Sequence, residues 1–216
     1  MKFEAVLFDC DGVLVDSEPI TNRVLREMLG ELGWELTQDE CMRHFVGKAL
    51  KEELSIIAAN TGRTVDGAWL SDFQRRRNAA LMEQLEPIPN IHDAVHRIHA
   101  HHDARIACAS GADRIKVEMQ LRKVGLMDYF DGRIFSGYET PRSKPFPDVY
   151  LAAARALHVD PRRCAVVEDT VTGVTAGVAA GATVFAYLPH GDDAALRDAG
   201  AVEIFSDMAD LPPLMH

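Results

Sequence analysis

Short apolar runs alternate with helical patterns along most of the chain. The runs lack the polar alternation of a half-exposed strand, which is typical of parallel strands covered by helices on both faces. They are AVLF at 5–8, ARIACAS at 104–110, RIFSG at 133–137, CAVVED at 164–169 and ATVFAY at 182–187. Helical patterns lie between them, over 90–101, 113–124, 147–157 and 170–179. This order predicts an α/β fold with a doubly wound, Rossmann-like parallel sheet.

One long segment interrupts the alternation. From 18 to 83 the sequence contains only helical stretches, in which Leu25, Met28 and Leu29 share one face. We therefore expect a Rossmann-like core made of 1–17 and 84–216, and an inserted all-helical domain over 18–83. Open α/β sheets bind ligands at the carboxyl ends of their strands. Because the insertion follows the first strand at that end, it is well placed to serve as a cap.

Charge and cysteine usage narrow the class of protein. The 216 residues carry a formal charge of −10, which disfavours binding to nucleic acids or anionic membranes. The four cysteines form no C-x-x-C pair, and the start of the chain does not resemble a signal peptide. No apolar stretch approaches the roughly 20 residues of a membrane helix. We therefore expect a cytoplasmic protein with free thiols and a small-molecule substrate.

Two aspartates follow the first apolar run. Asp9 and Asp11 are two residues apart and Gly12 comes directly after them. Since alternate strand residues project the same way, both carboxylates are expected to face one point. Hard carboxylate oxygens are ligands that suit Mg²⁺. An ordinary turn, in which an aspartate only ends the strand, is the alternative.

Other strand ends carry complementary chemistry. Glu168 and Asp169 end the run at 164–169, and Ser110 and Gly111 stand between a strand and a helix, where N–H groups favour an anion. Lys144 precedes another helix in SKPFPD. Each has a structural alternative, Ser110 as a helix cap and Lys144 as a solvated charge. Together they supply a cation site, a hydroxyl and an ammonium, the groups that phosphoryl transfer requires.

The four motifs DCDGVLVD, ASG, SKPFPD and VVEDT resemble, in this order, those of the haloacid dehalogenase superfamily, mainly its phosphatases. The resemblance spans nearly the whole chain and implies that the segment 18–83 is the family's small helical cap. The stretches FSGYETPRSKPFPDVY and DSEPI are similar to bacterial sugar-phosphate phosphatases, including 6-phosphogluconate phosphatase.

The resemblance also implies roles for individual residues. Asp9 is expected to attack phosphorus and form an aspartyl-phosphate, while Asp11 protonates the leaving alcohol and then deprotonates water. Haloacid dehalogenases proper lack the second aspartate, so Asp11 favours phosphate esters over halides. Ser110, Gly111 and Lys144 would hold the phosphoryl oxygens.

The implied cofactor is Mg²⁺. Its ligands would be the Asp9 carboxylate, the Asp11 carbonyl and Asp169, with Glu168 binding directly or through water. Asp16 is a weaker candidate for a role in the site, with anchoring of the turn behind Asp11 as the alternative.

Substrate choice is expected to come from the cap. Lys48, in HFVGKALKEE, is a candidate for contacting the substrate, with a solvated lysine as the alternative. Arg114, a few residues after Ser110, has the same two alternatives: contact with the substrate or a solvated side chain.

Several rival functions remain open. A receiver-like signalling domain also groups acids, a hydroxyl and a lysine, but it fits the long helical insertion poorly. A β-phosphoglucomutase-type enzyme resembles this chain, yet such members carry a histidine that SEPITNRVL lacks. Phosphoglycolate phosphatase is a further alternative. The partner expected is a small phosphate ester, and the chain is expected to be a monomer or a weak homo-oligomer.

Overall fold

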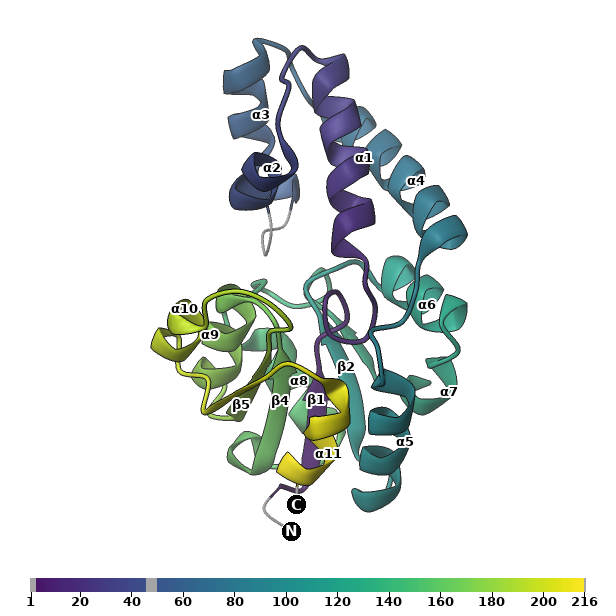
Figure 1. Ribbon diagram of the computed structural model, residues 1–216, viewed down its shortest axis with the longest axis vertical. Coiled ribbons are helices and arrows are strands. Elements are labelled where there is room, and N and C mark those ends of the chain that lie inside the picture. Colours follow the sequence, from purple (N-terminus) through teal and green to yellow (C-terminus); the bar gives the residue numbers. More distant parts are fainter. Residues whose placement is uncertain (1–2, 46–49, 216) are drawn as a thin grey trace. The chain divides into compact units, whose positions relative to one another are not determined.

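A parallel sheet of six strands forms the centre of the larger part of the chain (Figure 1). The computed structural model describes residues 3–45 and 50–215. The strand order is β3-β2-β1-β4-β5-β6, and every described pair is parallel. The strands are β1 (Ala5–Phe8), β2 (Ile106–Ser110), β3 (Ile134–Ser136), β4 (Cys164–Glu168), β5 (Thr183–Tyr187) and β6 (Glu203–Phe205). The predicted doubly wound α/β fold is confirmed.

Helices cover both faces of this sheet, which explains why its central strands are mainly apolar. On one face α8 (Asp148–Ala156) and α9 (Val171–Ala179) pack against alternate strand residues. Those strand residues are Ala5, Leu7, Ala107, Ala109, Cys164, Val166, Val184 and Ala186. The intervening residues bury against the other face, where the Phe8 ring meets Phe130 edge to face at 5.9 Å between centroids. The remaining helices of this part include α5 (Ile91–His101), α6 (Arg114–Lys123), α7 (Met127–Phe130), α10 (Ala194–Asp198) and α11 (Leu211–Leu214).

The sixth strand was not predicted. β6 has only three residues and lies at the edge of the sheet beside β5. Glu203 is exposed and Ile204 is only partly buried. This run therefore lacks the continuous apolar signal of the buried strands.

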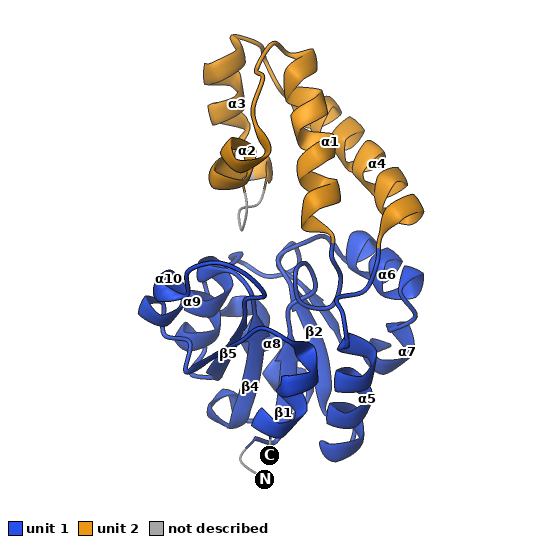
Figure 2. Ribbon diagram, viewed as in Figure 1, with its two compact units in different colours: residues 1–16, 86–216 blue, residues 17–85 orange. Residues whose placement is uncertain are grey.

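The chain divides into two compact units, coloured separately in Figure 2. Unit 1 comprises residues 1–16 and 86–216 and contains the sheet, while unit 2 comprises residues 17–85. The regular secondary structure among the described residues of unit 2 is entirely helical. Its elements are α1 (Glu18–Glu31), α2 (Gln38–Phe45), the 3₁₀ turn Leu50–Glu52, α3 (Leu54–Thr61) and α4 (Gly67–Gln84).

Unit 2 has an apolar core of its own. Leu25, Met28 and Leu29 of α1 are buried together with Ile57 of α3 and Phe73 of α4. The predicted apolar face of α1 is thus confirmed. Within the described residues, no helix is long and apolar enough to cross a membrane.

Candidate active site

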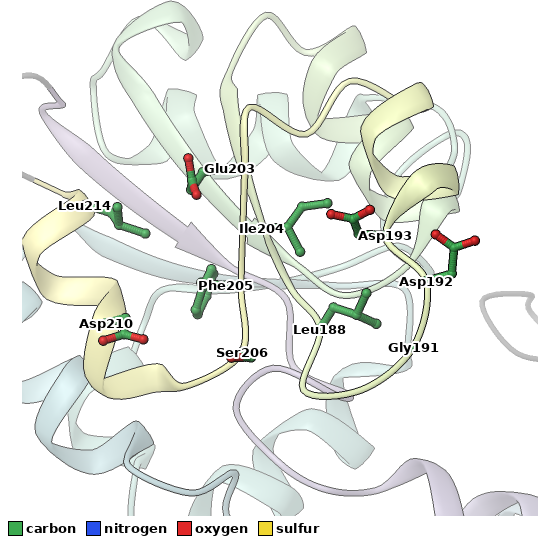
Figure 3. Close-up of a pocket in the computed structure, with 10 residues that line it drawn as sticks. All are labelled: Leu188, Gly191, Asp192, Asp193, Glu203, Ile204, Phe205, Ser206, Asp210 and Leu214. Carbon is green, nitrogen blue, oxygen red and sulfur yellow. The ribbon is translucent and has the colours of Figure 1, made fainter.

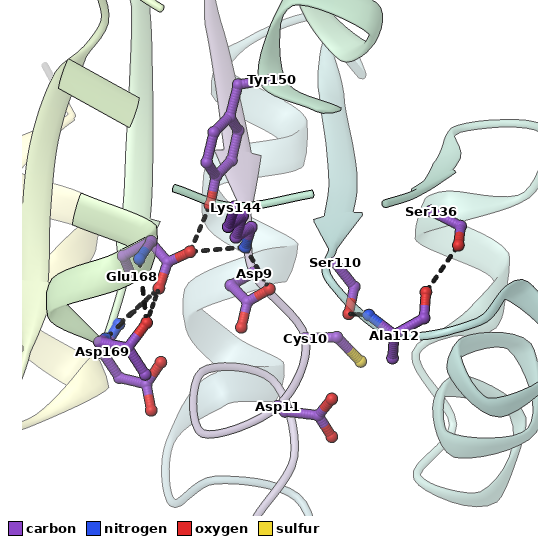
Figure 4. Close-up of polar contacts among 12 residues, drawn as sticks. Asp9, Cys10, Asp11, Ser110, Ala112, Ser136, Lys144, Tyr150, Glu168 and Asp169 are labelled. Carbon is purple, nitrogen blue, oxygen red and sulfur yellow. Dashed lines mark hydrogen bonds and ion pairs between the residues drawn. The ribbon is translucent and has the colours of Figure 1, made fainter. Parts of the chain in front are cut away.

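Polar side chains gather at the carboxyl end of the sheet in unit 1 (Figure 4). Asp9 directly follows β1, Ser110 ends β2 and Glu168 ends β4. Lys144 lies in the loop between β3 and α8. Parallel strands bring their carboxyl ends to the same edge, and therefore residues more than a hundred positions apart lie side by side.

Lys144 joins two of the carboxylates. Its Nζ lies 2.7 Å from Asp9 Oδ1 and 2.6 Å from Glu168 Oε1. The three side chains are almost completely buried, with 8%, 10% and 0% of their surface exposed. Buried charges need a partner of opposite sign, and the ammonium partly offsets the free-energy cost of burying the two carboxylates.

Burial and charge also shift the acidity of this group. Burial raises the pKa of Asp9 to about 7, aided by the charges of Glu168 and Asp11 and opposed by the Lys144 ammonium. Burial alone would lower the pKa of Lys144, but the Asp9 and Glu168 carboxylates outweigh it and raise that pKa well above its usual value. Lys144 therefore remains a cation.

Glu168 is held from several sides. The Tyr150 hydroxyl donates a hydrogen bond to its Oε1 at 2.6 Å. Its Oε2 accepts from the Asp169 N–H at 3.1 Å and from the Thr170 hydroxyl at 3.3 Å. Gly173 of α9 packs against it so closely that a Cβ there would lie 1.8 Å from Oε1. These contacts leave the Glu168 carboxylate little freedom to turn.

Three carboxylates form a candidate cation site. Among the described residues, Asp9, Glu168 and Asp169 each offer an oxygen, and these three oxygens lie within 4.8 Å of one another. Gly12, with φ of +77°, lies against Asp169: a Cβ on Gly12 would lie 2.0 Å from Asp169 Oδ2. An all-oxygen donor set of several negative charges, with one lysine to offset them, fits a hard divalent cation.

Asp11 does not face the point that the strand pattern predicted. Its Oδ1 and Oδ2 lie 2.7 Å and 2.8 Å from Lys116 Nζ, and Gln120 Nε2 donates to Oδ1 at 2.8 Å. Figure 4 shows its carboxylate directed away from Glu168 and Asp169. The chain turns at Gly12, whose N–H donates to Val15 O, and this turn ends the strand geometry that the prediction assumed.

The Ser110 region is a tightly bonded loop. Ser110 is 1% exposed, and its Oγ accepts a hydrogen bond from the Ala112 N–H at 3.1 Å. The Ala112 carbonyl in turn accepts from the Ser136 hydroxyl at 2.6 Å. Gly111 lies next to Gly137, where a Cβ would approach Gly111 Cα to 3.3 Å. The loop thus holds the predicted serine and glycine at the strand end, directly before α6.

Three further candidates from the sequence are Lys48, Arg114 and Asp16. Lys48 falls outside the described residues. Arg114 pairs with Glu139 at 2.6 Å and donates to the Ile134 carbonyl at 2.8 Å, which gives it a structural role in unit 1. Asp16 is exposed, and its backbone N–H donates to the Glu86 carbonyl at 3.0 Å.

Sequence reasoning missed Lys116, Gln120 and Tyr150. Lys116 and Gln120 are four residues apart on α6 and are buried beside Val117 and Leu121. A lysine and a glutamine on the apolar stripe of the helix after Ser110 are a usable signal, because buried polar side chains need partners. Tyr150 gave no such signal, since an aromatic residue on a helix face is ordinarily core.

A cavity of about 510 Å³ lies elsewhere in unit 1, along β6 (Figure 3). Its lining includes Leu188, Ile204 and Phe205 together with Asp192 and Asp210. None of the carboxylates around Lys144 lines it. The chemistry of the strand ends is therefore separate from this cavity.

Comparison with known proteins identifies the family. The model of the haloacid dehalogenase-like hydrolases matches residues 3–181. This chain therefore belongs to the haloacid dehalogenase-like hydrolases and is an enzyme, which confirms the resemblance read from its motifs.

Individual relatives agree with this placement. The 6-phosphogluconate phosphatase of Escherichia coli (strain K12) is 33% identical over 192 residues, covering 88% of this chain and 85% of that protein. A conserved haloacid dehalogenase-like protein of unknown function from Agrobacterium tumefaciens has a TM-score of 0.84 and 31% identity, covering 99% of this chain and 97% of the other. A hydrolase of the same family from Deinococcus radiodurans, solved with bound phosphate and sodium, has a TM-score of 0.78 and 34% identity over 97% and 93% of the two chains.

Proposed function

We propose that this enzyme is a Mg²⁺-dependent phosphomonoester hydrolase that acts on a small phosphorylated metabolite. The observation that carries the proposal is the buried contact of Lys144 with Asp9 and Glu168, beside Asp169. This contact supports the proposal because a carboxylate that can act as a nucleophile, an ammonium and a group of carboxylates able to hold a cation lie together at the carboxyl edge of the sheet. The relatives support the substrate class, a sugar phosphate or a sugar-acid phosphate such as 6-phosphogluconate.

The first half of the reaction transfers the phosphoryl group to the protein. An oxygen of Asp9 attacks phosphorus as the bond to the leaving oxygen breaks, giving an aspartyl-phosphate. Asp11 gives its proton to that leaving oxygen, so the product departs as an alcohol. Lys144 holds the nucleophile in place and offsets the negative charge of the phosphoryl oxygens.

The second half restores the enzyme. Asp11, now a carboxylate, takes a proton from a water molecule that attacks the phosphorus. The bond between Asp9 and phosphorus breaks, and inorganic phosphate leaves. The Ser110 hydroxyl and the Gly111 N–H hold phosphoryl oxygens during both halves. That a relative from Deinococcus radiodurans was solved with bound phosphate supports phosphate as a ligand of this family.

The cation site completes the assignment. Asp9, Asp169 and the Asp11 carbonyl would hold Mg²⁺, with Glu168 binding directly or through water. A bound Mg²⁺ supplies positive charge against the phosphoryl oxygens and lets two anions approach each other. Glu168 has a second role, because its carboxylate also holds the Lys144 ammonium in place.

Unit 2 is proposed to select the substrate. The core residues recognise phosphate and cation only, so discrimination among phosphate esters must come from other parts of the chain. We extend this proposal to the segment 18–83 as a cap and to Lys48 as a specificity residue. Alanine at position 48 should raise KM for the preferred substrate, and an unchanged KM for every substrate would remove Lys48 from that role.

A phosphate-release screen tests the function. Sugar phosphates, sugar-acid phosphates, phosphoglycolate and nucleotides are compared with Mg²⁺ and with EDTA, and EDTA should abolish release from every true substrate. Asp9→Asn should abolish turnover while the circular dichroism spectrum is unchanged. Asp128→Asn makes the same change at an exposed position of α7 and should keep the wild-type rate. An Asp9→Asn enzyme that retains most of its rate would contradict the nucleophile assignment.

A further inference from the structure

Two side chains of α6 converge on Asp11 from outside the catalytic motifs. Lys116 Nζ contacts both carboxylate oxygens, at 2.7 Å and 2.8 Å. Gln120 Nε2 adds a third contact, at 2.8 Å to Oδ1. Lys116 and Gln120 lie one turn apart on the same helix, so a single rigid element presents both donors.

Both donors are buried, although apolar residues at these two positions would serve the stability of the protein as well. Lys116 is 6% exposed and Gln120 is completely buried. Placing a lysine and a glutamine among core residues costs free energy, and well-packed apolar residues of similar size are often as stable or more so. The Asp11 carboxylate is the group on which these two buried donors converge.

The contacts determine where the Asp11 carboxylate can be. An ammonium that touches both oxygens fixes the carboxylate plane, and the amide on one oxygen opposes rotation of the side chain. Gln120 is itself held, because its Oε1 accepts a hydrogen bond from the Cys10 thiol at 3.6 Å. Asp11 is thereby kept apart from Asp9, Glu168 and Asp169, the carboxylates that form the cation site (Figure 4).

We propose that Lys116 and Gln120 are positioning residues that hold the Asp11 carboxylate ready for proton transfer and prevent it from joining the carboxylates of the cation site. The inference rests on the proposed function, since it takes Asp11 as the acid and base of phosphate-ester hydrolysis. Lys116 and Gln120 themselves do not exchange protons with the substrate.

The dependence on leaving group tests this inference. The leaving group of a sugar phosphate is the sugar alkoxide, which is strongly basic and needs a proton from an acid. The nitrophenolate of p-nitrophenyl phosphate is weakly basic and leaves without one. General acids contribute roughly 100-fold to 10,000-fold to such steps. Lys116→Met should therefore lower kcat on the sugar phosphate found in the screen at least about tenfold more than on p-nitrophenyl phosphate. Asp11→Asn should give the same kind of split.

A double variant and a matched control separate positioning from general damage. In Asp11→Asn the carboxylate to be positioned is gone, so adding Lys116→Met should cause no further loss on the sugar phosphate. Lys123→Met removes an exposed lysine from the same helix and should leave both substrates at the wild-type rate. Gln120→Leu should reproduce the split at smaller size, and it serves as the test if Lys116→Met does not fold.

Equal losses on both substrates, an unchanged rate, or a full additional loss in the double variant would overturn the inference. These outcomes are distinguishable from failure of the proposed function. In that case Asp9→Asn would keep its activity, or no phosphate ester would be hydrolysed by the wild-type enzyme.

Discussion

Replacing Gly173 by alanine should destabilise the protein, although the same change stabilises most helices. Gly173 belongs to α9, which begins directly after the Glu168–Asp169 pair. A Cβ at this position would lie 1.8 Å from Glu168 Oε1, 1.9 Å from its Cδ and 2.1 Å from its Oε2. Non-bonded atoms do not approach so closely, so the Glu168 carboxylate has to move, which disturbs its contacts with Lys144 and Tyr150.

Two opposing effects set the size of the change. Alanine is more favourable than glycine inside a helix by at most about 1 kcal/mol. Breaking one contact of a buried ion pair costs about 3 kcal/mol or more. Here the displaced Glu168 carboxylate stays buried without its ammonium, while Lys144 keeps Asp9 as a partner. The net result should be a loss of about 2 kcal/mol in the free energy of unfolding. Phosphatase activity should fall as well, since Lys144 loses one of its two carboxylate partners.

Urea unfolding measures this change: the midpoint urea concentration should fall, while the dependence of the free energy of unfolding on urea concentration stays the same. Gly30→Ala in α1 is the matched control, because a Cβ there meets only the end of the exposed Glu35 side chain, at 3.1 Å. The control should be neutral or slightly stabilised. If Gly173→Ala is as stable and as active as the control, the close packing of Gly173 on Glu168 cannot be what holds the Lys144 contact.

Two further predictions concern the cation site. Gly12→Ala should weaken Mg²⁺ binding at least about tenfold in a calorimetric titration, because the new Cβ displaces Asp169 and disturbing a group that supports a metal ligand typically costs that much. Gly33→Ala is the control: Gly33 has φ of +88° and open space around it, so this variant has similar backbone strain and should bind Mg²⁺ normally. The pKa of Asp9, raised by burial from its usual 3.8 to about 7, means that the metal-free folded state holds a proton that the unfolded state releases. The stabilisation contributed by Asp9 in EDTA should therefore be complete below about pH 4 and be lost as the pH rises to about 7. Between these values the free energy of unfolding of Asp9→Asn should fall less with pH than that of the wild type, and equal slopes for the two proteins would refute the linkage.

The sequence predicts the fold because the buried strands leave a clear pattern. Both faces of β1, β2, β4 and β5 are covered, so their sequences are apolar without interruption. β6 escaped prediction because its three residues at the sheet edge need not be apolar. The family followed from motifs at the strand ends, and the family comparison confirms it.

The interior of the site was less predictable. Asp9, Glu168 and Lys144 are brought together as strand-end chemistry suggested. The direction of the Asp11 side chain could not be predicted, since it depends on the turn at Gly12 and on Lys116 from a helix far along the chain. Pairing partners at such sequence separation leave no periodic signal. The functional roles of all these residues stay predictions.

The two crossing points between the units lie side by side within unit 1. The Asp16 N–H donates to the Glu86 carbonyl at 3.0 Å, and Val15 forms a β-bridge with Pro87. The chain therefore leaves and re-enters the core at adjacent positions. The entropy of closing a loop between such points grows only with the logarithm of its length. A segment of very different size could be exchanged at this junction at little thermodynamic expense to the sheet, which leaves the helical segment free to diversify while the strand-end chemistry stays unchanged.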